Sequence, residues 1–456
     1  MKKIGVMALV LLNLAVILLT VYFIWYFYNV INYIYYKAPT PVINYVFLDN
    51  FNNINISYKV DERNLRSKMY FLYKTDSTIP SISDERWQEV SDNKVSFKLD
   101  KNIYYAFFKN EDNEIFKINN VDTIGKVTEL KVNKDKVYLA IYGEYDLKAV
   151  WDSIGNVQDN LTWTSEDGNI ASIDQNGHIK GLKSGKTKIT AKIMDESVDT
   201  EVIVTDLITL RPNSYNSKKP YLSCGRYNKE ENDLLDEILK ARIDDVGYKT
   251  RAGAVEAARF LALEFPYKIR YFSENGRGST NGVDGEGRYY HVGLYLDESR
   301  FSGIGKKSNG PKTWGCSLYS RPSHGYRSNG LDCSGFVSWV LLNGGFDVGD
   351  IGAGLAPHLD LTDYGKRTNF NASVVSSGKV KVGDLLSSGG VNGGHIAIIV
   401  GEDNNYYYVA ESLWTPPNVA VVIIPYSKKT IFNRYYYVML MDSYYQEDGN
   451  LTKLWY

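Results

Sequence analysis

The sequence predicts a C-terminal α+β domain, preceded by all-β sandwich modules and one transmembrane helix. Three observations predict this fold class. An apolar run of 23 residues from Ile4 to Tyr26 opens the chain, interrupted only by Asn13 and Thr20. Apolar and polar residues then alternate from about residue 39 to residue 206, with the period of two that is typical of half-buried strands. In the last part of the chain, helical periodicity is combined with short apolar strands.

The composition is that of a chain that folds into several domains. At 456 residues, the chain is long enough for about three domains. Lys and Arg together number 52 and Asp and Glu 53, and the net charge of -1 gives no electrostatic basis for a nucleic-acid partner. The three cysteines are too few for a scaffold stapled by disulfides or for a zinc site of four thiolates.

The apolar run is long enough to anchor the chain in a membrane. As a helix its 23 residues span roughly 34 Å, against about 30 Å for the hydrocarbon core of a bilayer. Aromatic residues crowd its C-terminal end, as at a membrane interface, and no small-x-small cleavage site follows. Because Lys2 and Lys3 precede the run, we expect residues 1–38 to be a cytoplasmic tip and a retained anchor helix. The protein is then a single-pass membrane protein, with the bulk of the chain extracellular.

Two β modules are predicted between the anchor and the last domain. From 39 to 125, short alternating runs are separated by turn clusters such as Asp49–Asn53, which predicts a β-rich immunoglobulin-like or fibronectin-like sandwich. From 126 to 206, alternating strands are joined by turn glycines, and Trp163 is expected in the core. Neither module contains a catalytic constellation, so we expect both to act as a spacer.

The second module carries the more specific pattern. In order along the chain it contains Leu161–Ser165, Ile170–Asp174 and Gly177–Gly181. These stretches resemble the group 2 bacterial immunoglobulin-like domain over residues 126–206. The resemblance implies a β-sandwich of the kind that is found in surface proteins.

The C-terminal domain is predicted at 224–456, after a polar linker with prolines at 207–223. Apolar residues recur with helical spacing from Asn228 onward, and Thr250 is suited to cap a second helix.

Two motifs in this domain place a thiol and an imidazole where they suit catalysis. The box Asp332-Cys333-Ser334-Gly335 precedes an apolar helical run, so Cys333 is expected at a helix N-terminus, whose free N–H groups stabilise a thiolate. Gly394-His395 heads an apolar strand, so the His395 ring is held rigidly to take the thiol proton and later protonate a leaving amine. Glu411, at the end of the next strand, is the candidate that orients the imidazole, and a surface carboxylate is the alternative interpretation of it.

Together these motifs resemble the NlpC/P60 family of papain-like cell-wall cysteine hydrolases. The resemblance covers residues 225–445 and is firmest over 330–412. It implies a papain-like α+β fold and a thiol protease that cleaves an amide bond in the peptide part of peptidoglycan, through a thioester at Cys333. The peptide part of peptidoglycan is the expected substrate. The bacterial cell membrane is the second expected partner, through the N-terminal helix.

The same resemblance implies roles for further residues. Asp332 and Ser334 would contact the free amine of the substrate peptide, and Tyr271 would line the pocket of the nucleophile. NlpC/P60 proteins often have a histidine as the third catalytic residue. This sequence has Glu411 there, which is more like the related CHAP amidases. A CHAP-type N-acetylmuramoyl-L-alanine amidase is therefore the alternative activity.

Other interpretations stay open at the level of sequence. Cys316 is the rival nucleophile, although no helix start follows it, and Cys224 and Cys316 are alternatively a disulfide pair outside the cell. No His-Glu-x-x-His, Cys-x-x-Cys or phosphate-binding glycine loop occurs, so we expect neither a metal nor a cofactor. A non-catalytic surface adhesin or wall-binding protein, or an acyltransferase that uses the same thiol, are the remaining functional alternatives.

Overall fold

The chain divides into two compact units, each assembled from separate stretches. The computed structural model describes residues 2–35, 37–61, 66–210, 221–222, 229–269, 271, 290–294, 306–307, 317–321, 325–328, 331–349, 361–389, 394–414 and 421–451. The first unit comprises Met1–Asn133, Leu147–Thr164 and Thr190–Asp199. The second comprises Lys134–Asp146, Ser165–Ile189 and Thr200–Tyr456. The predicted second β module therefore contributes strands to both units.

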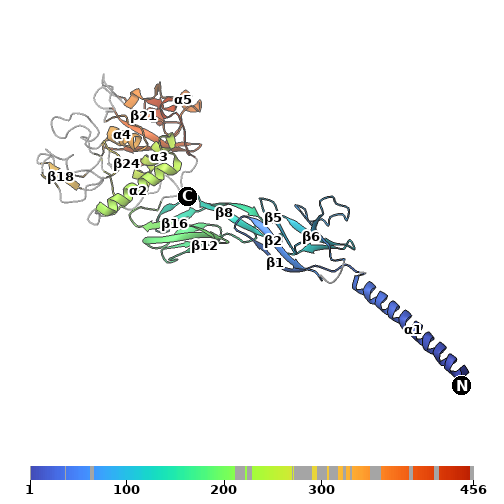
Figure 1. Cartoon of the computed structure of the whole chain (residues 1–456). Helices are drawn as coiled ribbons and strands as arrows, with labels where there is room; N and C mark the ends of the chain where they lie inside the picture. The colour runs from blue at the N-terminus through green and yellow to red at the C-terminus, as the bar shows by residue number, and fades with distance from the viewer. Residues whose placement is uncertain are drawn as a thin grey trace. The chain divides into compact units, whose positions relative to one another are not determined.

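The N-terminal helix α1, Lys2–Tyr35, contains the predicted anchor (blue in Figure 1). Among the described residues it is the one helix that is long and apolar enough to cross a membrane, and its apolar stretch runs from Gly5 to Ile31. Inside this stretch the hydroxyl of Thr20 donates to the carbonyl of Val16, which satisfies a polar group on an apolar helix. Such a helix suits a membrane anchor, and an N-terminal signal sequence has the same properties.

The first β module is a sandwich of two antiparallel sheets. One sheet has the order β1-β2-β5 and the other the order β4-β3-β6-β7. Their strands are β1 (Val42–Leu48), β2 (Asn53–Lys59), β3 (Met69–Lys74), β4 (Gln88–Val90), β5 (Lys94–Lys98), β6 (Tyr105–Asn110) and β7 (Ile115–Ile118). The inward side chains of both sheets share one apolar core that includes Ile56, Phe71 and Phe108. At the predicted turn, Asn52 takes a left-handed conformation with φ 64°, which asparagine tolerates better than most residues.

The second β module consists of three sheets. They have the orders β11-β8, β12-β15-β16-β9 and β10-β14-β13, and β9 pairs with β16 in parallel. The strands are β8 (Gly125–Val132), β9 (Lys136–Ala140), β10 (Glu144–Asp146), β11 (Ala149–Gly155), β12 (Thr162–Ser165), β13 (Ala171–Ile173), β14 (His178–Gly181), β15 (Gly185–Ile193) and β16 (Glu196–Thr205). Trp163 is buried, as the sequence predicts, and the residues of β15 alternate between the core and the surface.

The C-terminal domain is α+β, with a six-stranded antiparallel sheet of order β20-β25-β21-β22-β23-β24. Its strands are β20 (Lys366–Asn369), β21 (Leu385–Ser387), β22 (Ile396–Glu402), β23 (Tyr406–Ser412), β24 (Val421–Ser427) and β25 (Tyr437–Leu440). The helices are α2 (Lys229–Val246), α3 (Arg251–Arg259, continued by a π-helical turn to Glu264), α4 (Cys333–Asn343), α5 (Ala372–Ser376) and α6 (Asp442–Tyr445). A small separate sheet contains β17 (Lys306–Lys307), β18 (Ser317–Arg321) and β19 (Gly325–Ser328).

Strand β22 lies between two apolar cores, because its side chains alternate between the two faces of the sheet. Ile398 and Val400 belong to the core that also contains the buried residues of α3 and α4. Ala397 and Ile399 belong to the core on the other face. A strand buried on both sides is held in one register, and this strand begins next to His395.

The predicted linker at 207–223 needs correction at its start. Leu207 and Ile208 are buried and share a core with α2, and the N–H of Thr209 donates to the carbonyl of Glu264 at 3.1 Å. The chain therefore enters the C-terminal domain directly, without a free polar segment at these positions. Residues 211–220 and 223 lie outside the described residues.

The strand β9 also packs against the C-terminal domain within the second unit. Tyr138 is buried in the core shared with α2, and its hydroxyl donates to Glu237 at 2.8 Å. Arg242 donates to the carbonyl of Tyr138 at 3.0 Å, and Lys134 forms an ion pair with Asp245. These contacts make part of the second β module a structural component of the C-terminal domain, and not only a spacer.

Removal of the β modules should therefore destabilise the C-terminal domain. A fragment that starts at residue 207 loses the contacts of Tyr138, Ala140 and Ile203 and exposes the apolar side chains of α2 that they cover. We expect its midpoint of thermal unfolding to lie roughly 5–10 °C below that of the full chain, since 1 kcal/mol shifts the midpoint by about 2–4 °C in a domain of this size. Calorimetry on both proteins measures the difference, and equal midpoints would contradict the structural role.

Candidate active site

Cys333 is the first residue of α4, and the residue before it caps the helix. The Asp332 carboxylate accepts a hydrogen bond from the N–H of Gly335 at 2.7 Å and another from the hydroxyl of Ser334 at 3.1 Å. An aspartate in this position satisfies an N–H group that the helix itself leaves unpaired. Asp332 and Ser334 are fully buried, so the structure gives both a part in the cap. Their contact with a substrate amine stays a prediction.

His395 lies immediately before β22, and Ser388, the residue after β21, holds its backbone by two hydrogen bonds. Its N–H donates to the hydroxyl of Ser388 at 3.1 Å, and its carbonyl accepts from the N–H of Ser388 at 2.9 Å. The Cys333 thiol is near enough to the His395 ring to raise its pKa. The thiol also lies 3.8 Å from the carbonyl oxygen of Gly394, so the start of α4 and the start of β22 meet at the sulfur.

Glu411, near the end of β23, completes this arrangement. Its Oε2 lies 2.6 Å from Nε2 of His395, which leaves Nδ1 of the ring for Cys333. The Glu411 side chain is fully buried. The structure thus brings together the three residues for which the sequence predicts catalytic roles, and places Glu411 in the core instead of on the surface.

Three further side chains surround the buried carboxylate, and the sequence did not nominate them. The hydroxyl of Tyr426 donates to Oε1 of Glu411 at 2.6 Å, and the hydroxyl of Tyr435 donates to Oε2 at 2.8 Å. Arg434 donates to Oε2 at 3.3 Å, and its guanidinium lies over the rings of both tyrosines. We call Tyr426, Arg434 and Tyr435 the Glu411 cage. The sequence signal that could have indicated it is the excess of tyrosine, 37 residues against 17 phenylalanines.

The cage keeps Glu411 ionised in an environment that disfavours charge. Burial by itself raises the pKa of a carboxyl group, but the hydrogen bond and charge of His395, with Tyr426 and Arg434, lower the pKa of Glu411 below its ordinary value. Burial and the charge of Glu411 raise the pKa of Tyr435, so this hydroxyl keeps its proton and remains a donor.

The ionised Glu411 in turn favours a protonated imidazole. Burial by itself lowers the pKa of a histidine, but the hydrogen bonds and charges of Cys333 and Glu411 outweigh it and raise the pKa of His395 to about 9. A protonated imidazole beside a cysteine at a helix N-terminus can give its proton to a leaving group, which nucleophilic cysteine catalysis requires.

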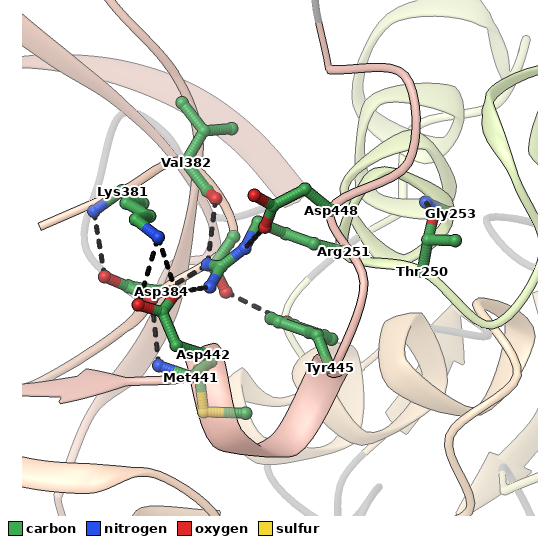
Figure 2. A network of polar contacts seen from close by, with 11 residues as sticks. Thr250, Arg251, Gly253, Lys381, Val382, Asp384, Met441, Asp442, Tyr445 and Asp448 are labelled. Atoms are coloured by element: carbon green, nitrogen blue, oxygen red, sulfur yellow. Dashed lines mark hydrogen bonds and ion pairs between the residues drawn. The ribbon is translucent and has the colours of Figure 1, made fainter.

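The motif Gly383-Asp384 directly precedes β21, and Asp384 belongs to the polar network around Arg251 that Figure 2 shows. Arg251 and Asp384 are both fully buried and form an ion pair at 2.9 Å, and the Asp384 carboxylate also accepts from the N–H of Met441 at 3.0 Å. Gly383 has a φ of +96°, which favours glycine, and its N–H donates to the carbonyl of Ile399 at 2.7 Å. The motif thus ties the start of β21 to β22, the strand that His395 precedes.

Tyr271, the third residue predicted to contact the substrate, lies next to the nucleophile segment. Its backbone forms a parallel β-bridge with Leu331, two residues before Cys333. Its ring packs edge-to-face against Trp414. Cys224 and Cys316 lie outside the described residues, and so does their predicted pairing. In the part of the chain that the structure describes, no group of three or more His, Cys, Asp or Glu side chains is arranged to hold a metal ion.

Comparison with known proteins identifies one of the β modules. The family model of the bacterial Ig-like domain (group 2) matches residues 126–204. Residues 126–204 form a group 2 bacterial Ig-like domain. This confirms the resemblance predicted from sequence over 126–206, within two residues at the C-terminal boundary. The Ig-like domain supplies Tyr138 and Ile203 to the core of the second unit.

Other likenesses are partial. An uncharacterised protein of Clostridium acetobutylicum is 37% identical over 84 residues, which are 18% of this chain and 8% of that protein. Domains 4 and 5 of the S-layer protein SbsC are 20% identical, with a TM-score of 0.16, and the match covers 22% of this chain and 64% of that one. A mutant of intimin from EHEC O157:H7 is 19% identical, with a TM-score of 0.16, over 27% of this chain and 69% of that one. This chain therefore spans a small part of the curated relative and less than two thirds of the SbsC fragment, and similarity at this level carries no information on activity.

Disruption of the buried ion pair behind the site should destabilise the domain strongly. Arg251→Ala leaves the Asp384 carboxylate buried without its cation, which costs roughly 3–5 kcal/mol of unfolding free energy. The matched control is Lys381→Ala, which removes an exposed partner of Asp442 and should cost less than about 1 kcal/mol. Denaturant unfolding of both variants measures the two values. Equal effects would show that the Arg251 network does not stabilise the fold.

Proposed function

We propose that this chain is a membrane-anchored, extracellular cysteine hydrolase that cleaves an amide bond in the peptide part of peptidoglycan. The observation that carries the proposal is the chain of contacts from Cys333 at the start of α4, through the His395 ring, to the buried and ionised Glu411. The motifs around Cys333 and His395 resemble those of the NlpC/P60 family, which adds the substrate class and the papain-like fold to the proposal. The apolar helix α1 supports an anchor, which would hold the enzyme beside a polymer that cannot diffuse to it.

The geometry is suited to a two-step reaction. The Cys333 thiolate attacks the carbonyl carbon of the scissile amide, and negative charge develops on the carbonyl oxygen. The His395 imidazolium gives its proton to the leaving amine as the C–N bond breaks, which leaves a thioester on Cys333. The neutral His395 then takes a proton from water as the water attacks the thioester. The products are a carboxylic acid and the restored pair of Cys333 thiolate and His395 imidazolium.

Glu411 also favours a second candidate activity. A glutamate as third member is the feature that the sequence shares with CHAP amidases, and N-acetylmuramoyl-L-alanine amidase activity uses the same three residues. The two activities differ in the bond that is broken: an endopeptidase leaves a peptide stub on the muramic acid, and an amidase leaves a free lactyl carboxylate. Mass spectrometry of the released muropeptides distinguishes them.

The first test removes the nucleophile. Cys333→Ala should abolish the release of fragments from purified peptidoglycan, because the attacking sulfur is lost while the helix cap on Asp332 remains. The amount of fragment released by wild type and variant is measured by mass spectrometry, with circular dichroism as a control for folding. Undiminished release by the variant, or no release by the wild type, would contradict a hydrolase and favour the non-catalytic adhesin.

The second test uses pH. Because the His395 imidazolium must donate a proton, kcat/KM should fall on the alkaline side near pH 9, the pKa to which Cys333 and Glu411 raise His395. Glu411→Gln removes a negative charge that raises this pKa, so the alkaline limb should move to lower pH and kcat should drop on the order of 10- to 10⁴-fold. Glu402→Gln is the matched control, since Glu402 ends β22, the strand that His395 precedes, and is partly exposed against Lys428. An alkaline limb that is the same in Glu411→Gln and wild type would exclude the proposed role of Glu411.

A further inference from the structure

Trp414 is an exposed tryptophan close to the candidate active site. It lies three residues after Glu411, beyond the end of β23, and 65% of its surface is exposed. Trp339 in α4 shows the contrast, because it is fully buried and its indole N–H donates to the carbonyl of Gly293 at 3.0 Å. An exposed indole offers a large, rigid apolar face that a ligand can cover.

The Trp414 ring is not isolated. It packs edge-to-face against Tyr271, with ring centroids 5.5 Å apart and an interplanar angle of 74°. The ring of Tyr271 is half-buried, so part of both rings is open to solvent. An edge-to-face pair fixes the orientation of both rings, and so forms a preorganised surface.

Backbone contacts tie this aromatic pair to the candidate nucleophile. Tyr271 forms a β-bridge with Leu331, two residues before Cys333. The hydroxyl of Ser412, between Glu411 and Trp414, donates to the carbonyl of the same Leu331 at 2.7 Å. Both segments therefore contact Leu331, two residues before the start of α4.

We propose that Trp414 and Tyr271 form a subsite that binds a neutral pyranose ring of the glycan strand, next to the peptide attached to it. Neither ring carries a charge, whereas a peptidoglycan stem peptide carries carboxylates and an amine. The flat C–H faces of N-acetylated hexosamines are the uncharged part of that polymer and suit an aromatic surface. This subsite rests on the proposed function for its substrate, and it deepens that function by adding recognition of the sugar.

The kinetic test compares two substrates that differ only in the sugar. For Trp414→Ala in the full chain, kcat/KM on a disaccharide-peptide should fall about 10-fold more than kcat/KM on the same peptide without the sugar. Tyr406→Ala is the matched control, because Tyr406 is an exposed tyrosine at the opposite end of β23 and should leave this ratio unchanged. Equal losses on both substrates in Trp414→Ala would overturn sugar recognition by this residue.

A binding test separates this inference from the proposed function. The full chain with Cys333→Ala is titrated with an oligosaccharide of N-acetylglucosamine, which requires no turnover. We expect calorimetrically detectable binding that weakens about 10-fold when Trp414→Ala is added. If the oligosaccharide binds but wild type hydrolyses no peptidoglycan, the proposed subsite is supported and the proposed hydrolase activity is rejected. Absence of binding, or binding that Trp414→Ala does not change, would overturn the subsite.

Discussion

A buried carboxylate that remains ionised is the interaction on which the candidate site depends. Glu411 is fully enclosed, and enclosure alone would favour its neutral form. It stays charged because His395, Tyr426, Arg434 and Tyr435 all donate to its two oxygens. The charge of Glu411 then holds His395 protonated beside Cys333. Without the Glu411 cage the carboxyl group would be neutral and would no longer stabilise the protonated His395 ring. The pKa of His395 would then lie nearer its ordinary value.

The strands of the six-stranded sheet determine where His395 and Glu411 lie. His395 and Glu411 can meet only if β22 and β23 keep their register, and the alternation of Ile398 and Ile399 into opposite cores specifies that register for β22. The Arg251–Asp384 pair fixes the strand on the other side of β22. Part of the Ig-like domain belongs to the same unit and shares its core through Tyr138. Catalytic geometry and domain stability are therefore coupled through the same sheet.

The sequence predicted those parts of the site that local patterns encode. Cys333 was placed by the capping aspartate and the apolar run that follows it, and His395 by the strand that follows the ring. Glu411 could be nominated only by its position, since its burial depends on side chains from β24 and from the turn before β25. Tyr426, Arg434 and Tyr435 were missed for the same reason: their convergence on one carboxylate is a tertiary fact with no periodic signal. The prediction of a linker was wrong at Leu207 and Ile208. The prolines and lysines that follow indicate a linker, but these two apolar residues pack against α2, and the sequence does not show that contact.

The central claim is that His395 activates the thiol of Cys333, and the rate at which iodoacetamide alkylates Cys333 tests it most directly. The rate is followed by peptide mass spectrometry between pH 5 and pH 9 for wild type and His395→Ala, because alkylation reports the thiolate without any assumption about the substrate. We expect substantial labelling of wild type in the acidic half of this range, and a fall of about 10-fold or more there in His395→Ala. Identical rates in the two proteins across the range would contradict the account, because the thiol would then be independent of the imidazole.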